Sequence, residues 1–124
     1  MTESQETFLR AVAARVPLDL VAEVHLFPSM RQGPMETGLA VLATSPAPPA
    51  GPRERHTVFS ARYRLTLRGP ERGKLEVDVT AEADAPLVTV DQVVRGVQRR
   101  SADTGDPERL SGDELRRLAA AAVV

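Results

Sequence analysis

The clearest pattern in the chain is a long alternation of apolar and polar residues between residues 55 and 83. It is interrupted once, by the turn-forming residues 69–73. Because side chains of a strand point alternately to its two faces, this alternation predicts two strands that each bury one face. With a turn between them, they are expected to form an antiparallel hairpin. The positions expected to face the core are all odd-numbered: Phe59, Ala61, Tyr63, Leu65, Leu67, Leu75, Val77, Val79, Ala81 and Ala83.

The two arms of this hairpin carry opposite charge. Residues 53–73 hold six arginines and two glutamates, a net charge of +4, whereas residues 75–91 hold five acids and no base, a net charge of −5. Since the core positions of both arms must share a face, odd residues must pair with odd residues. A five-residue turn then predicts Arg64 opposite Asp78 and Ser60 opposite Glu82. Neighbouring registers in which the paired residue numbers also sum to an even value likewise bring arginine beside acid. We therefore expect cross-strand ion pairs, each contributing ~0.2–1 kcal/mol.

Three segments have the pattern of capped helices. Thr2 and Gln5 have the spacing of a capping box, and apolar residues follow at helical spacing until a proline ends the segment. Residues 89–100 begin with a second such box and residues 111–122 with a third. A polar loop, residues 101–110, is expected between these two helices.

Two further strands are predicted before the hairpin. Residues 39–44 are apolar on both faces, which is typical of a central strand or of one whose second face is covered. Residues 20–27 alternate and form the other strand, and the intervening residues 28–37 are expected to be a loop. The four prolines of residues 45–53 predict an extended surface crossing. One face of the first strand is expected to carry Leu20, Ala22, Val24 and Leu26.

Together these elements predict a single α+β domain over residues 1–124. Its sheet is four-stranded and antiparallel, built from two hairpins. One N-terminal and two C-terminal helices are expected on one face, in the order α-β-β-β-β-α-α. A chain of this length can bury one core, and neither flank of the proline-rich crossing could form a core alone.

Composition removes several classes of function. The chain has no cysteine, which excludes disulfides, thiolate metal sites and a cysteine nucleophile. Aromatic residues make up only 3%, which disfavours a base-stacking platform. No apolar run approaches the ~20 residues needed to span a bilayer, and the polar N-terminal residues do not resemble a signal peptide. We expect a cytoplasmic protein, and the excess of arginine over lysine suggests a GC-rich bacterial genome.

The candidate catalytic and metal-ligating residues do not form a recognisable constellation. His25 and His56 would need a third zinc ligand, such as Glu23 or Glu36, and no spacing supplies one. Ser29 lies between His25 and Glu36 in sequence, but these residue types alone do not define a triad. The glycines match neither a P-loop nor a dinucleotide fingerprint. No metal, cofactor or catalytic residue is predicted.

The most unusual segment is residues 27–35, where two methionines lie in a polar loop. Methionine is adaptable and is favoured at binding surfaces. Helices can cover only one face of residues 39–44, so the other face needs a partner or another part of the chain. The alternatives are that both methionines fill gaps over the core, or that residues 46–52 seal the strand. The predicted protein-interaction residues are Phe27, Met30, Arg31, Met35, Ala40 and Leu42.

Three classes of function follow from these patterns. The favoured class is a non-enzymatic protein-interaction or assembly subunit that binds a protein partner or a second copy of itself. A nucleic-acid accessory protein using the arginine-rich hairpin is the first alternative, although the opposing acids and the net charge of −1 argue against it. A small enzyme or ligand-binding domain using His25, Arg31 and Glu36 is the second. No membrane partner is expected.

Overall fold

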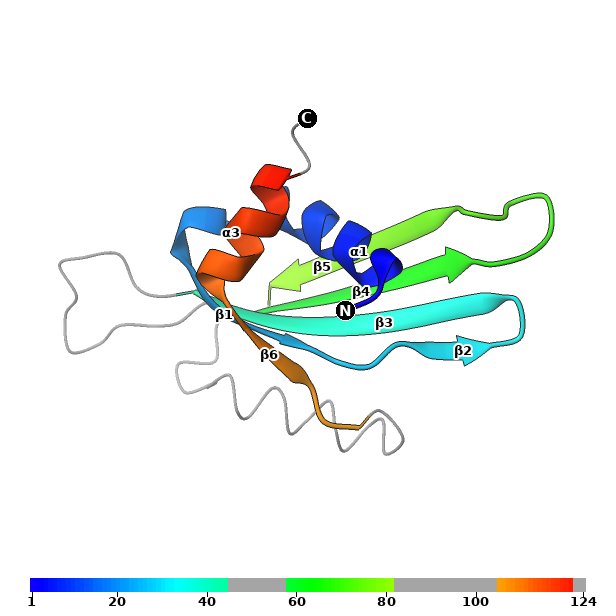
Figure 1. Cartoon of the computed structure of the whole chain (residues 1–124), viewed down its shortest axis with the longest axis horizontal. Coiled ribbons are helices and arrows are strands. Elements are labelled where there is room, and N and C mark those ends of the chain that lie inside the picture. The colour runs from blue at the N-terminus through cyan, green and yellow to red at the C-terminus, as the bar shows by residue number, and fades with distance from the viewer. Residues whose placement is uncertain (45–57, 82–104, 122–124) are drawn as a thin grey trace, which may run out of the picture.

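The computed structural model describes residues 1–44, 58–81 and 105–121. These ranges contain two α-helices, one short 3-10 helix and six strands (Figure 1). The helical elements are α1 (Glu3–Ala13), η1 (Leu18–Leu20) and α3 (Gly112–Ala121). The strands are β1 (Val21–Leu26), β2 (Met30–Gln32), β3 (Met35–Thr44), β4 (Val58–Thr66), β5 (Leu75–Ala81) and β6 (Glu108–Ser111). No helix in the described ranges is long and apolar enough to cross a membrane.

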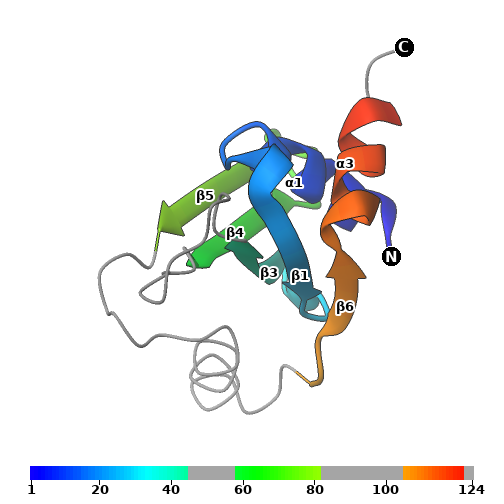
Figure 2. The ribbon, with the colours of Figure 1, turned by 90° about the vertical axis from the view of Figure 1, so that its left-hand side faces the viewer.

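All six strands belong to one sheet, in the order β5-β4-β3-β1-β6, and β2 pairs with β3 beyond the end of β1. Each described pairing is antiparallel. Both α-helices lie on the same face of this sheet (Figures 1 and 2). The expected α+β class is therefore confirmed.

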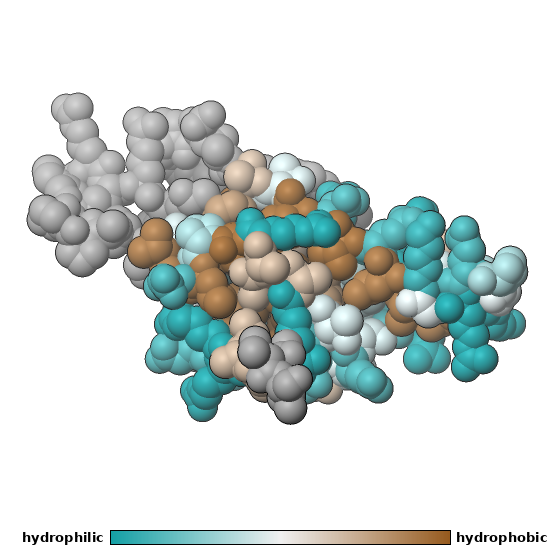
Figure 3. Space-filling model, turned by 90° about the horizontal axis from the view of Figure 1, so that it is seen from above, coloured by the Kyte–Doolittle hydropathy of each residue, from teal (hydrophilic) through white to brown (hydrophobic). Residues whose placement is uncertain are grey.

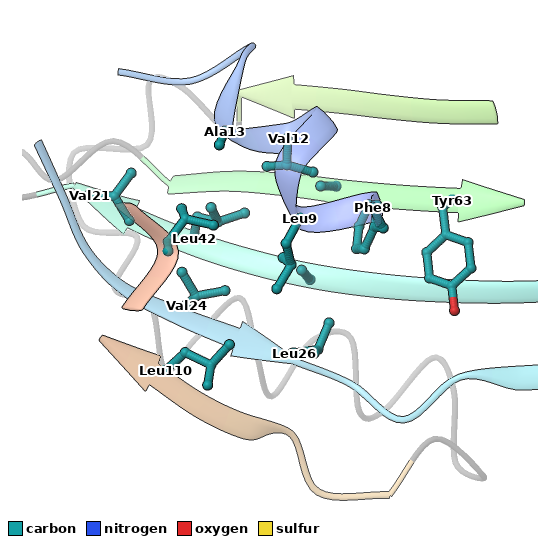
Figure 4. Close-up of a cluster of buried hydrophobic side chains, with 13 residues drawn as sticks. Phe8, Leu9, Val12, Ala13, Val21, Val24, Leu26, Leu42, Tyr63 and Leu110 are labelled. Atoms are coloured by element: carbon teal, nitrogen blue, oxygen red, sulfur yellow. The ribbon is translucent and has the colours of Figure 1, made fainter. Parts of the chain in front are cut away.

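The main core lies between the sheet and the two helices (Figure 4). Helix α1 contributes fully buried residues at helical spacing, and β3 contributes Ala40 and Leu42 beneath them. The predicted capping box is present: the Gln5 N–H donates to Thr2 Oγ1 over 3.2 Å, and the Thr2 N–H donates to Gln5 Oε1 over 2.9 Å. The residues that α1 buries are Gln5, Phe8, Leu9, Val12 and Ala13.

The C-terminal helix also begins as predicted. The Glu114 N–H donates to Ser111 Oγ over 3.1 Å, and Glu114 Oε1 accepts from the Ser111 N–H over 3.3 Å. The helix predicted over residues 89–100 and the proline-rich crossing lie outside the described residues. Leu115 is the buried side chain by which α3 joins the main core.

The prediction of four strands is wrong, because residues 30–32 and 108–111 form short strands where the sequence pattern predicts loops. The predicted loop 28–37 contains β2, which pairs with the first residues of β3 around Gly33, whose φ is +59°. The predicted loop 101–110 ends in β6, which pairs with β1. Neither strand produces an alternation: β2 has three residues, and β6 buries a single apolar side chain, Leu110. Each segment forms a strand because it hydrogen-bonds to an existing sheet, although its own sequence shows no strand pattern.

The predicted faces of β1 are also partly wrong. Val21 lies opposite Thr44, but Glu23 lies opposite Ala43, so the register shifts at Ala22. A β-bulge of this kind puts two residues opposite one and changes which side chains share a face. Val21 therefore joins Val24 in the main core, whereas Leu20 and Ala22 are exposed.

The long hairpin forms with the predicted faces but in a different even register. Arg64 lies opposite Glu76 and Arg62 opposite Asp78, so the predicted pairing of Arg64 with Asp78 is wrong. The turn is centred one residue earlier: the Thr66 N–H donates to Lys74 O, and the Gly73 N–H donates to Thr66 O. Odd residues still pair with odd residues, because burying one face of the hairpin requires it. Apolar patterning alone does not choose between registers that differ by two residues.

The second face of the sheet carries its own apolar cluster. Phe27, Val41 and Val58 are buried there, and Leu39 packs against them. His25 lies on the same face, since it pairs with Val41. The second face of β3 is therefore not an open apolar surface.

Candidate functional site

The six predicted interaction residues divide into two groups. Phe27, Ala40 and Leu42 are fully buried, with 0% exposure. Ala40 and Leu42 face the main core, whereas Phe27 belongs to the cluster on the opposite face. In this conformation these three side chains are not accessible to a partner. The other three lie together on the β2–β3 hairpin: Met30, Arg31 and Met35.

Two hairpin tips lie side by side at one end of the sheet. Met35 of β3 pairs with Thr66 of β4, and the Leu67 N–H donates to Pro34 O over 2.7 Å. We define residues 30–37 and 64–76 as the two-hairpin end. Figure 1 shows this end extending past α1 and α3, which cover only the other part of the sheet. It is therefore a part of the described sheet that has no helix above it.

The two-hairpin end carries partly exposed apolar side chains. The Thr66 hydroxyl lies 3.7 Å from Met35 Sδ, which links the two hairpins through their side chains. Viewed from the helix side, apolar surface continues from the helices towards this end and is bordered by polar side chains (Figure 3). The half-buried apolar residues here lie on both faces of the sheet. Leu65 and Leu75 pair with each other and share the helix side with Glu36, whereas Met30 and Met35 lie on the opposite face with Thr37 and Thr66, and Leu67 lies at the β4–β5 turn.

The buried Glu36 carboxylate connects three strands at the base of the two-hairpin end. Glu36 is 4% exposed, and its Oε2 accepts from the Tyr63 hydroxyl over 2.9 Å. Its Oε1 accepts from Arg31 Nε over 3.4 Å, and the rest of the Arg31 side chain is mostly exposed. Burial, together with Glu36, raises the pKa of Tyr63 well above its ordinary value, which keeps the phenol protonated as a donor. The network joins β2, β3 and β4, so it holds the hairpins in register.

The ring of Tyr63 needs a glycine beside it. Gly38 is its cross-strand partner, and a β-carbon at this position would overlap the ring. The ring also meets Phe8 of α1, with a centroid distance of 4.7 Å and a tilt of 45°. Tyr63 therefore connects helix packing to the two-hairpin end.

The residues of the predicted ligand-binding alternative are not brought together. His25 lies on the second face of the sheet, whereas Glu36 points to the helix side, where it meets Tyr63. His25 Nε2 is buried without a hydrogen-bond partner in the described residues, and Glu23 Oε1 lies 3.7 Å from it. Glu23 is itself paired with Arg109. The described residues contain no group of three side chains suited to hold a metal ion.

The arginine face of the long hairpin is partly neutralised. Arg64 Nη2 lies 2.9 Å from Glu76 Oε2, and this pair lowers the pKa of Glu76. Lys74 lies 3.5 Å from the same glutamate. Arg62 is placed opposite Asp78 by the strand register. Cross-strand pairing of arginine with acid is therefore present, although with other partners than the turn length predicted.

Comparison with family models, with curated protein sequences and with solved structures found no match to this chain. The site is therefore defined by its own geometry. Sequence reasoning found Met30, Arg31 and Met35 but missed Leu67, which the β4–β5 tip brings beside Pro34. Each of the two turns is marked by a positive-φ glycine beside a proline or a charged residue. No local sequence pattern shows that the two turns lie side by side.

Proposed function

We propose that the chain is a protein-interaction subunit that binds its partner through the two-hairpin end. The observation that carries this proposal is the extension of two hydrogen-bonded hairpin tips beyond both helices, with half-buried Met30, Met35 and Leu67 on them. Partly exposed apolar side chains on a rigid support, bordered by arginine, are typical of interface centres and rims. Methionine suits such a surface because its flexible side chain adapts to a partner.

The support is rigid because it is hydrogen-bonded at several points. The Glu36 network fixes β2 to β3 and β4, and the Leu67–Pro34 hydrogen bond fixes the two tips to each other. A preorganised surface loses less conformational entropy on binding than a free loop would. This is the reason to favour binding over a gap-filling role for the two methionines.

The test compares wild type with a Met30→Asp/Met35→Asp variant in affinity capture and in light scattering at several concentrations. Arg117→Glu, on the exposed face of α3, is the matched control. We expect wild type and the control to retain a partner, or to self-associate, and the double variant to lose that behaviour while keeping the same circular dichroism. Strict monomers with no captured protein in all three samples would overturn the proposal.

A further inference from the structure

The two-hairpin end carries an excess of positive charge although the chain is slightly acidic. It contains five cationic side chains and three carboxylates, a net charge of +2, whereas the whole chain has a net charge of −1. The carboxylates are Glu36, Glu71 and Glu76, and the cations are Arg31, Arg64, Arg68, Arg72 and Lys74.

All three carboxylates are already engaged. Glu36 is paired with Arg31, Glu76 with Arg64, and Glu71 lies 3.9 Å from Lys74. Arg68 and Arg72 have no ion pair within the described residues, and both are exposed. They flank the β4–β5 turn, next to the half-buried Leu67. Two guanidinium groups without an ion pair in the described ranges therefore lie close to a half-buried leucine at this turn.

We infer that the partner of the two-hairpin end is a different protein, which presents acidic side chains around an apolar one. This inference rests on the proposed function and adds the chemistry of the partner. Arginine recognises carboxylates through paired N–H donors, and complementary charge favours one partner over others. A symmetric contact between two copies of this end would instead bring Arg68 and Arg72 towards their own counterparts, which opposes a tip-to-tip dimer.

A nucleic acid fits this surface less well. The one tyrosine of the chain is buried against Phe8, so no exposed ring of the two-hairpin end can stack on a base. The half-buried leucine and methionine side chains would gain nothing from contact with a phosphate backbone. The apolar side chains of this surface therefore favour a protein partner over a nucleic acid.

The test uses backbone-amide NMR of the isotope-labelled chain with three probes. They are a soluble glutamate-rich peptide with interspersed leucines, the same peptide with lysine for each glutamate, and single-stranded oligodeoxythymidine. We expect the acidic peptide alone to shift the resonances of the β4–β5 turn and of Met30 to Met35. Arg68→Glu/Arg72→Glu should weaken that binding at least about tenfold, because two attractions become repulsions.

Three results would overturn this inference: equal shifts with the lysine peptide, tighter binding of the oligonucleotide at the same residues, or no shift with any probe. None of them decides the proposed function, which stands or falls on the Met30→Asp/Met35→Asp capture experiment. If that variant loses the captured protein while the acidic peptide causes no shift, the two-hairpin end is the binding surface but the inferred chemistry of its partner is wrong. If capture is unaffected, the proposed function itself fails.

Discussion

At the scale of single residues, Tyr63 links the core to the two-hairpin end. It is buried, it contacts Phe8, and its hydroxyl donates to the nearly buried Glu36. A protonated phenol donates a hydrogen bond to that carboxylate, whereas an ionised phenol would be repelled by it because both groups would be negative. The same contact therefore sets both local geometry and the ionisation of the tyrosine.

This predicts a loss of stability in alkali that depends on Tyr63. Its pKa is raised from the ordinary value of 10.0, so its contribution is fully present below pH 10.0 and is lost as the pH rises further. Because it is the only tyrosine, the near-ultraviolet absorbance of tyrosinate reports it alone. We expect this absorbance to appear only when the protein unfolds, whereas the chain in urea should titrate normally. Titration near pH 10 with retained structure would contradict the burial of the phenol.

The Tyr63→Phe variant supplies the control. It should lose the steep alkaline dependence, and at neutral pH it should be less stable by about 1–3 kcal/mol, because Glu36 loses a donor while remaining buried. Denaturant unfolding at neutral pH and at high pH measures both effects.

Gly38 is a second residue whose role follows from its neighbour. Gly38→Ala should destabilise the protein by about 1–3 kcal/mol, because the added methyl group overlaps the Tyr63 ring. In a Tyr63→Ala background the same substitution should cost clearly less, because the ring is gone. Equal costs in both backgrounds, measured by chemical denaturation, would show that the ring is not what excludes a side chain there.

At the scale of elements, the sequence predicted what depends on a local pattern and missed what depends on pairing. The capping boxes at Thr2 and Ser111 and the faces of β4 and β5 follow from residues close in sequence. β2 and β6 do not, since each is too short to show a period and is a strand only because a neighbour offers hydrogen bonds. The bulge at Ala22 is likewise invisible in the pattern, which is why the alternation places Leu20, and not Val21, on the same face as Val24.

The candidate site shows the same limit. Met30, Arg31 and Met35 were predicted because they form an unusual local segment. Their neighbour Leu67 was not, because it reaches them through the pairing of β3 with β4. Ala40 and Leu42 were included because both faces of their strand are apolar, and the structure places them under α1 instead.

The hairpin register makes an element-scale prediction that nuclear Overhauser data can check. The Thr66 N–H donates to Lys74 O, so Thr66 and Lys74 form a hydrogen-bonded pair. The alternate pairs are not hydrogen-bonded and have closer Cα atoms, and these should be Tyr63 with Val77 and Ala61 with Val79. We expect strong contacts between the α-protons of these pairs. Contacts of Tyr63 with Val79 would instead indicate the register that a five-residue turn predicts. In that case Arg64 would lie opposite Asp78, and its ion pair with Glu76 would be lost.

At the scale of the whole molecule, the helices divide the sheet into a packed part and an extended part. α1 and α3 bury the helix side over the main core, and a second cluster containing Phe27 is buried on the other face. The two-hairpin end extends beyond the helices (Figure 1). In the described ranges, it combines partly exposed apolar side chains with arginines that have no ion pair, which is why we propose it as the binding surface.

Site-specific photo-crosslinking in cells that make the protein tests this conclusion most directly. A photoreactive phenylalanine analogue would replace Gln32 or Pro70, which are exposed on the two hairpin tips, or Ala120, which is exposed on α3. We predict that both tip positions crosslink to the same protein, that Ala120 does not, and that Met30→Asp/Met35→Asp abolishes the product. Crosslinks from Ala120 but from neither tip, or no product at any position, would contradict a binding role for the two-hairpin end.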